Sequence, residues 1–164
     1  MAAPPMRDDD DGVLPEWLNL VPTANDVPGS TGVTVDGEAC RTRRGLLAEW
    51  ARALDFPGYF GHNWDAFADC LTDRAWPEVA DPDHPTELLG PLSVAVRHGE
   101  RLLVDERPDQ LTTFLVVLDD VATGRTLLQP GPHWSPDEPR LLLTLLLPAG
   151  AAGELSHRLR TAWR

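Results

Sequence analysis

The sequence predicts an α/β domain in which a small, three-stranded parallel β-sheet is packed with helices. Three short apolar segments with strand character alternate with longer segments whose apolar residues recur every three or four positions. Because parallel strands need crossover connections, which are usually helices, this alternation favours a parallel sheet. The chain has 164 residues, of which 42% are hydrophobic and 24% are charged, so one domain with its own core is expected.

The N-terminal region is expected to be a flexible arm over residues 1–30. This stretch is rich in Pro, Asp and Gly, and Asp8–Asp11 are four consecutive acids. The apolar patch Trp17–Leu20 is a candidate to tack the arm to the body of the protein. The domain itself is predicted over residues 31–164, and it begins with a short strand at 32–37 that an Asp-Gly turn closes.

Two helices are expected after this first strand. Residues 43–55 carry apolar side chains at helical spacing, and Pro57 with Gly58 ends that helix. Asn63 is a suitable N-cap for the second helix, which is expected to run to about Thr72. The apolar residues of the two helices are Leu46, Leu47, Trp50 and Leu54 in the first, and Trp64, Phe67 and Leu71 in the second.

The second half of the chain alternates loops with regular elements. Proline-rich residues 77–91 are expected to form a loop before a strand at 92–96. Residues 109–123 are ambiguous, because FLVVL has strand character locally, but the length of the apolar repeat and the stop at Gly124 favour a helix. After a second loop at 124–139, the continuous apolar run at 141–147 suits a strand that is buried on both faces.

The end of the chain is expected to be a short helical extension over residues 148–164, outside a core that spans residues 33–147. Leu155 and Leu159 would face inward, and Trp163 is a further candidate for the buried side.

The charge balance restricts the classes of partner. There are 26 acidic and 14 basic residues, which gives a net charge of −12, and every basic residue is Arg. Such a surface repels phosphate backbones and anionic membranes, so direct binding of nucleic acid or membrane is disfavoured and a basic partner is favoured.

The sequence predicts no cofactor and no metal site. Cys40 and Cys70 lie outside any CxxC or CxxH pattern, and the glycine-rich motifs of nucleotide binding are missing. The first residues contain no apolar signal core, and the apolar stretch 141–153 is too short to span a bilayer and is interrupted by Pro148. We therefore expect a cytoplasmic protein with reduced thiols.

The most informative segment is residues 56–73, which joins an aromatic loop to an acidic helix. Asp65, Asp69 and Asp73 recur at every fourth residue and so form one line along the helix. Like charges at this spacing destabilise a helix slightly, although Asp65 in the first turn complements the helix dipole. Two interpretations stay open on pattern alone: a solvated helix face, or an interaction surface.

The segment LDFPGYFGHNWDAFADCLTD, residues 54–73, resembles the signature segment of the barstar family of intracellular ribonuclease inhibitors. In that family an aromatic-Gly-x-Asn loop leads into an acidic helix. The resemblance continues in element order over roughly residues 33–147, with two loops that are longer than in the prototype. The positions that match the helix motif are Asn63, Asp65, Ala66, Asp69, Cys70, Leu71 and Thr72.

This resemblance implies the three-stranded parallel sheet and an activity, namely plugging the active site of a small basic, barnase-like ribonuclease. It implies that Asp69 enters the phosphate site of the enzyme, that Asp65 supports it and that Tyr59 stacks on the enzyme. A late-helix acid assists, and counting back from Gly124 places it at Asp119, with Asp120 adjacent. The implied ribonuclease-binding residues are Tyr59, Phe60, Gly61, Asn63, Asp65, Ala68, Asp69 and Asp119.

The chain also departs from the family pattern at the predicted interface. Ala68 stands where the prototype has a Trp, and Phe60 lacks the hydroxyl of a second loop tyrosine. Gly58 and His62 replace acidic residues beside the loop. These differences bear on the identity of the partner more than on the fold.

Other functions are weighed against inhibition. A metal site or an acid/base pair made from His62, Asp65 and Asp69 would need further ligands that no spacing indicates, so an enzyme is not expected. The alternative is a binding module of the same fold with a partner that is not a nuclease. The free protein is expected to be a monomer, and its target could be the cell's own secreted enzyme or an injected toxin.

Overall fold

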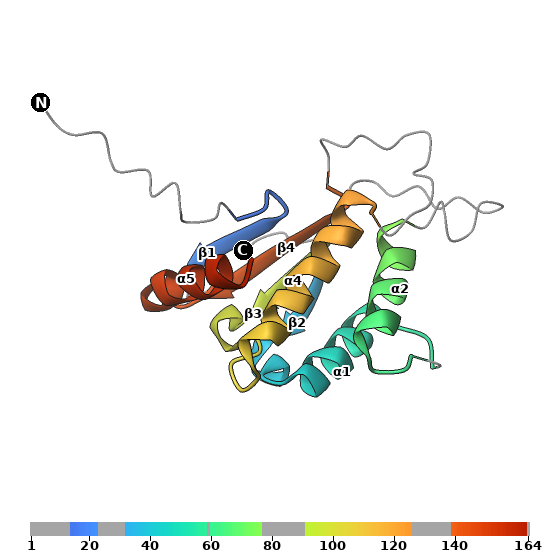
Figure 1. The fold of residues 1–164 in the computed structure, drawn as a ribbon, viewed down its shortest axis with the longest axis horizontal. Coiled ribbons are helices and arrows are strands. Elements are labelled where there is room, and N and C mark those ends of the chain that lie inside the picture. The colour runs from blue at the N-terminus through green and yellow to red at the C-terminus, as the bar shows by residue number, and fades with distance from the viewer. Residues whose placement is uncertain (1–13, 23–31, 59, 77–90, 126–138, 164) are drawn as a thin grey trace, which may run out of the picture.

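The computed structural model describes residues 14–22, 32–58, 60–76, 91–125 and 139–163, and its fold is drawn in Figure 1. Four strands form one sheet in the order β1-β4-β3-β2, and every neighbouring pair is parallel. The strands are β1 (Leu18–Pro22), β2 (Val33–Asp36), β3 (Leu92–Arg97) and β4 (Leu141–Leu147). The main helices are α1 (Arg43–Leu54), α2 (Trp64–Ala75), α4 (Pro108–Thr123) and α5 (Ala152–Trp163).

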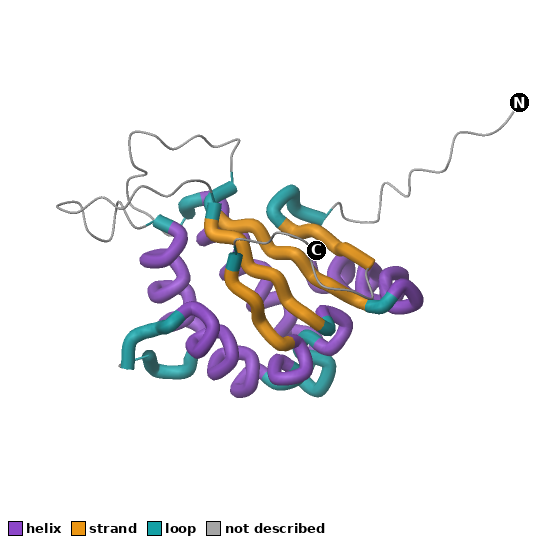
Figure 2. The backbone as a smooth tube through the Cα atoms, turned by 180° about the vertical axis from the view of Figure 1, so that it is seen from behind, coloured by secondary structure: helices purple, strands orange, loops and turns teal. Residues whose placement is uncertain are grey.

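The molecule has two layers, one of strands and one of helices. Figure 1 shows the helices in front of the sheet, and the view from behind in Figure 2 shows the strands in front of the helices. Short 3₁₀ turns link strands to helices at η1 (Gly37–Cys40), η2 (Gly99–Arg101) and η3 (Ala149–Ala151). The predicted parallel α/β architecture is confirmed.

The sheet has one strand more than the sequence predicted. Residues 18–22, which were assigned to the flexible arm, form the edge strand β1 beside β4, with Leu18 level with Leu143 and Leu20 level with Leu145. The predicted flexible arm is therefore wrong for residues 18–22, which belong to the sheet. Trp17, immediately before the strand, is 2% exposed and belongs to the core, so this apolar patch does attach the N-terminal region to the body of the protein.

The other predicted strands and helices are confirmed, whereas most of the two predicted loops, 77–91 and 124–139, lies outside the described residues. The ambiguous segment is the helix α4, which starts with Pro108 in its first turn and ends at Gly124 in the left-handed conformation. The terminal helix α5 buries Leu155 and Leu159, and Trp163 packs edge-on against Trp17 with ring centroids 6.1 Å apart.

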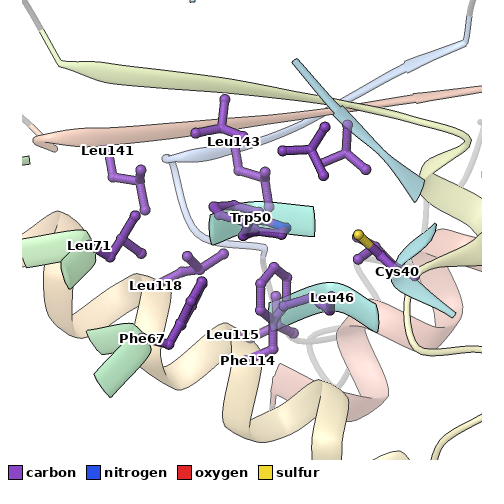
Figure 3. Packing of buried hydrophobic residues seen from close by; sticks show 14 of the residues in the cluster. Cys40, Leu46, Trp50, Phe67, Leu71, Phe114, Leu115, Leu118, Leu141 and Leu143 are labelled. Atoms are coloured by element: carbon purple, nitrogen blue, oxygen red, sulfur yellow. The ribbon is translucent and has the colours of Figure 1, made fainter. Parts of the chain in front are cut away.

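Trp50 of α1 is the centre of the core and ties three helices together. Its ring makes edge contacts with Phe67 of α2 at 5.5 Å and Phe114 of α4 at 5.6 Å between centroids. Figure 3 shows these rings beneath Leu143 of the sheet. Such aromatic pairs contribute about 0.5–1.5 kcal/mol each beyond the area they bury, so α2 is held on a rigid base.

Both cysteines are free thiols and both are buried. Burial, together with the smaller effects of the nearby Glu49 and Asp36 carboxylates, raises the pKa of Cys40 to about 12. The Cys40 thiol is therefore an apolar packing group and not a nucleophile.

Candidate functional site

The helix α2 begins as its sequence predicts, at an Asn63 cap. The side-chain oxygen of Asn63 accepts a hydrogen bond from the backbone N–H of Ala66 at 2.8 Å. This bond satisfies one of the free N–H groups of the first turn, and Asp65 in the same turn complements the helix dipole. Asn63 therefore has a structural task, although its side chain is exposed.

Two tryptophans hold the ends of α2 against α4. The indole N–H of Trp64 donates to Oε1 of Gln110 at 3.0 Å, and that of Trp76 donates to the carbonyl oxygen of Val121 at 2.8 Å. Since each end of α2 meets the corresponding end of α4, the two helices run side by side in the same direction. The face of α2 that packs inward is formed by Phe67, Cys70, Leu71 and Ala75.

The opposite face of α2 carries the three carboxylates that the sequence placed in one line. Asp65, Asp69 and Asp73 are all exposed, and none of them forms an ion pair or a hydrogen bond with another described residue. Partial burial raises the pKa of the Asp73 carboxyl, and the charge of Asp69 raises it further. We call Asp65, Asp69 and Asp73 the acidic stripe; within the described part of the chain, no cation pairs with these three carboxylates.

The loop before α2 has an inward and an outward part. Phe60 is 7% exposed and packs against Phe56 with ring centroids 5.2 Å apart, so its ring supports the loop from inside. Gly61 and His62 are exposed, and His62 adopts a left-handed backbone with φ of 50° while its ring lies 4.8 Å from that of Phe60. Tyr59 lies outside the described residues.

Ala68 lies half-buried one position before Asp69. Successive helical residues are rotated by about 100°, so Ala68 stands between the acidic stripe and the side of α2 that faces α4. A methyl group at this point leaves the carboxylate of Asp69 without a large apolar neighbour on that side.

Asp119, which is predicted to assist binding, is largely buried. It is 8% exposed, and its carboxylate accepts one hydrogen bond from the indole of Trp17 at 2.9 Å and another from Arg125 at 2.8 Å. The neighbouring Asp120 has a side chain 37% exposed and is the acid that this end of α4 presents. A signal was available in the sequence, because Asp119 is four residues after Leu115 and so continues an apolar face.

The outer surface of α2 and α4 brings the acidic stripe together with Asp120. The acidic stripe runs along α2, and Asp120 lies toward the carboxyl end of the adjacent α4. Val116, one turn before Asp120, is 47% exposed and is an apolar side chain on the same outward side of α4. A helix surface of this kind can present its carboxylates to a cationic partner.

Features typical of other kinds of site lie elsewhere or are not found in the described part of the chain. No group of three or more His, Cys, Asp or Glu in it could hold a metal ion. A cavity of about 470 Å³ lies between α4 and α5, and its walls, which include Leu103, Leu111 and Arg158, contain none of the predicted site residues. None of the described helices is long and apolar enough to cross a membrane.

A comparison with protein-family models matches this chain to barstar (barnase inhibitor) over residues 31–129. This range covers more than half of the chain. The chain belongs to the barstar family. A search of the curated proteins gave no match.

Barstar-family proteins are non-enzymatic inhibitors, and family membership implies an inhibitor of barnase-type ribonucleases. The matched range contains the whole path from β2 through the acidic stripe of α2 to the end of α4. The edge strand β1, the last strand β4 and the helix α5 lie outside it. Of these elements, β1 and α5 meet where Trp17, just before the strand, packs against Trp163.

Proposed function

We propose that this barstar-family protein inhibits a basic, barnase-type ribonuclease by placing the acidic stripe of α2 in the active site of the enzyme. Asp69 is the central carboxylate and takes the place of the RNA phosphate, with Asp65 beside it. The observation that supports this most directly is that these carboxylates are exposed and have no cation among the described residues.

The chemistry of the target explains why a carboxylate suits the task. A ribonuclease must bind phosphate and stabilise an anionic transition state, so its active site concentrates Arg, Lys and His. A carboxylate on a helix can pair with those groups without being cleaved. The helix is already formed and braced by Trp64 and Trp76, so little conformational entropy is lost on binding.

The net charge of −12 has a second effect, on the rate of association. Attraction between an acidic inhibitor and a basic enzyme can raise the association rate constant toward 10⁸–10⁹ M⁻¹s⁻¹ at low salt. Repulsion by the same charge disfavours RNA itself as a ligand. We propose that the protein acts as a monomer in the cytoplasm, where it would protect the cell from a secreted or an incoming ribonuclease.

The proposal is tested by mixing the protein with a panel of barnase-type ribonucleases and following RNA cleavage and association as salt is raised. Exposed charges are screened over about 10 Å at 0.1 M ionic strength. Inhibition of at least one enzyme, with association that slows steeply between low and high salt, is the expected result. If no enzyme is inhibited, or if association does not depend on salt, phosphate mimicry by the stripe is wrong.

A further inference from the structure

Arg125 is a cation placed at the end of the proposed inhibitory surface. It follows Gly124, the left-handed cap of α4, and its guanidinium reaches back over the last turn. Its Nη1 lies 2.8 Å from Oδ2 of Asp119 and 3.7 Å from Oδ1 of Asp120. The Arg125 side chain is 68% exposed, so this positive charge faces solvent.

The two carboxylates that Arg125 contacts differ in kind. Asp119 is buried and is fixed on its other oxygen by the indole of Trp17, so it holds the guanidinium in place. Asp120 is the exposed member, and Arg125 stays near it because Asp119 anchors the cation. The acidic stripe of α2 has no such partner among the described residues, so the surface contains one neutralised acid and three free ones.

We propose that Arg125 is a built-in competitor for the ribonuclease: it occupies Asp120 and repels the cationic rim of the enzyme, and thereby limits how fast and how tightly the surface binds. This inference rests on the proposed function, because it concerns the same surface. Any cation of the enzyme that approaches Asp120 meets a guanidinium already there. Like-charge contacts of this kind are a general means by which interfaces reject partners.

A purely structural role predicts a different outcome. A cation beside the last turn of a helix also stabilises the helix dipole, and Arg125 satisfies the buried Asp119. If that were its whole effect, removing the charge would lower stability and would leave association unchanged or slower. The two roles therefore move the association rate in opposite directions.

The test measures association of R125Q with an inhibited ribonuclease by stopped flow, at low and high salt. We expect R125Q to associate about two- to fivefold faster than wild type at low salt, with the difference lost at high salt. R125K, which keeps the charge, should stay close to wild type. R125M, which keeps the aliphatic stem, is a second neutral variant if R125Q melts too low for the assay.

R41Q is the matched control, because it makes the same change in net charge at another site. Arg41 is an exposed arginine paired with Asp105 at 2.9 Å, before α1 and outside the acidic surface. R41Q should change association less than R125Q does. An equal gain in both would show only the effect of net charge, and no gain or a slower rate for R125Q would also overturn the inference.

D120N completes the test as a double-variant cycle. With Arg125 present, D120N should change affinity less than twofold, because the carboxylate is already occupied. In the R125Q background the same change should reverse most of the gain in association rate. If the effects of D120N and R125Q on association are independent of each other, the proposed competition is wrong. If the wild-type protein inhibits no ribonuclease, the proposed function itself is wrong.

Discussion

Two acids on the adjacent helices α2 and α4 are used in opposite ways. Asp69, on the outer face of α2, is exposed and has no partner among the described residues, whereas Asp119, on α4, is buried and accepts hydrogen bonds from Trp17 and Arg125. A carboxylate that the fold has satisfied contributes to the free energy of folding. One that the fold leaves unsatisfied contributes little to folding and is available to bind.

This difference predicts which property each residue controls. Asp119 joins α4 to the segment before β1 and so secures the extension that lies outside the barstar match. Asp69 joins nothing within the described chain, and its neighbours Asp65 and Asp73 repel it. Function and stability are therefore separable by single substitutions on two adjacent helices.

The largest expected effect is on binding by D69A. Loss of the Asp69 carboxylate would leave cationic groups of the enzyme buried without a partner. This should weaken the binding free energy by about 2–5 kcal/mol, a scale established partly with the prototype of this same family. The free energy of unfolding should change by no more than a few tenths of a kcal/mol, because the substitution removes repulsion on an exposed helix face. Titration of inhibition together with urea unfolding of the variant measures both quantities.

D119A should show the reverse pattern. Removing the carboxylate leaves the indole N–H of Trp17 buried without its acceptor, and hydrogen bonds to a charged group contribute about 1.5–3 kcal/mol each. We expect a loss of that order in the free energy of unfolding, with inhibition by the folded protein nearly unchanged. A large loss of inhibition by D119A at unchanged stability would show that Asp119 contributes to binding.

W17F tests the same hydrogen bond by removing its donor. The donor to Asp119 is lost and the smaller phenyl ring leaves part of the indole's space unfilled, so we expect a destabilisation of at least about 1.5–3 kcal/mol. Denaturant unfolding of W17F, D119A and the double variant should give non-additive losses, since the two residues share one hydrogen bond. Strict additivity would mean that the bond contributes nothing.

These contrasts also show where the sequence was sufficient. The helix α2 was predictable because its signals are local: an Asn63 cap, an apolar stripe, and carboxylates four residues apart. The ambiguous segment became a helix for reasons that are also local, Pro108 at its start and Gly124 at its end. Such features need no knowledge of the rest of the chain.

The parts that could not be predicted depend on contacts between distant segments. Trp17 and Asp119 are 102 residues apart, so the pair that buries this acid has no sequence signature. Similarly, Leu18–Pro22 has only two inward-facing leucines in a region rich in Pro and Asp, and it becomes a strand because β4 provides a long apolar edge. The burial of Phe60 against Phe56 could not be predicted either, because it depends on how the loop folds back.

The smallest expected effect concerns Asp73, at the end of the acidic stripe. Its raised pKa means that the folded state disfavours the charged form, so stability decreases as pH rises from the usual range of Asp pKa values into the raised one. D73N should therefore stabilise the protein by a few tenths of a kcal/mol at pH 7, and this gain should shrink as pH falls through the raised range and be absent below about 4. Thermal melts of both proteins across this range measure it.

D73N also serves as the control for Asp69 in binding. One turn further along α2, it should lie at or beyond the rim and weaken inhibition by about 1 kcal/mol or less. Equal losses for D69A and D73N would mean that the stripe acts only through its total charge.

The central claim is that the acidic stripe occupies the phosphate site of a ribonuclease, and steady-state inhibition kinetics test it most directly. The apparent inhibition constant is measured on an inhibited enzyme at increasing concentrations of a short RNA substrate. If the stripe fills the active site, inhibitor and RNA compete, and the apparent constant rises in proportion to substrate above KM. A constant that stays the same at every RNA concentration would show that the protein binds away from the active site and would contradict the account.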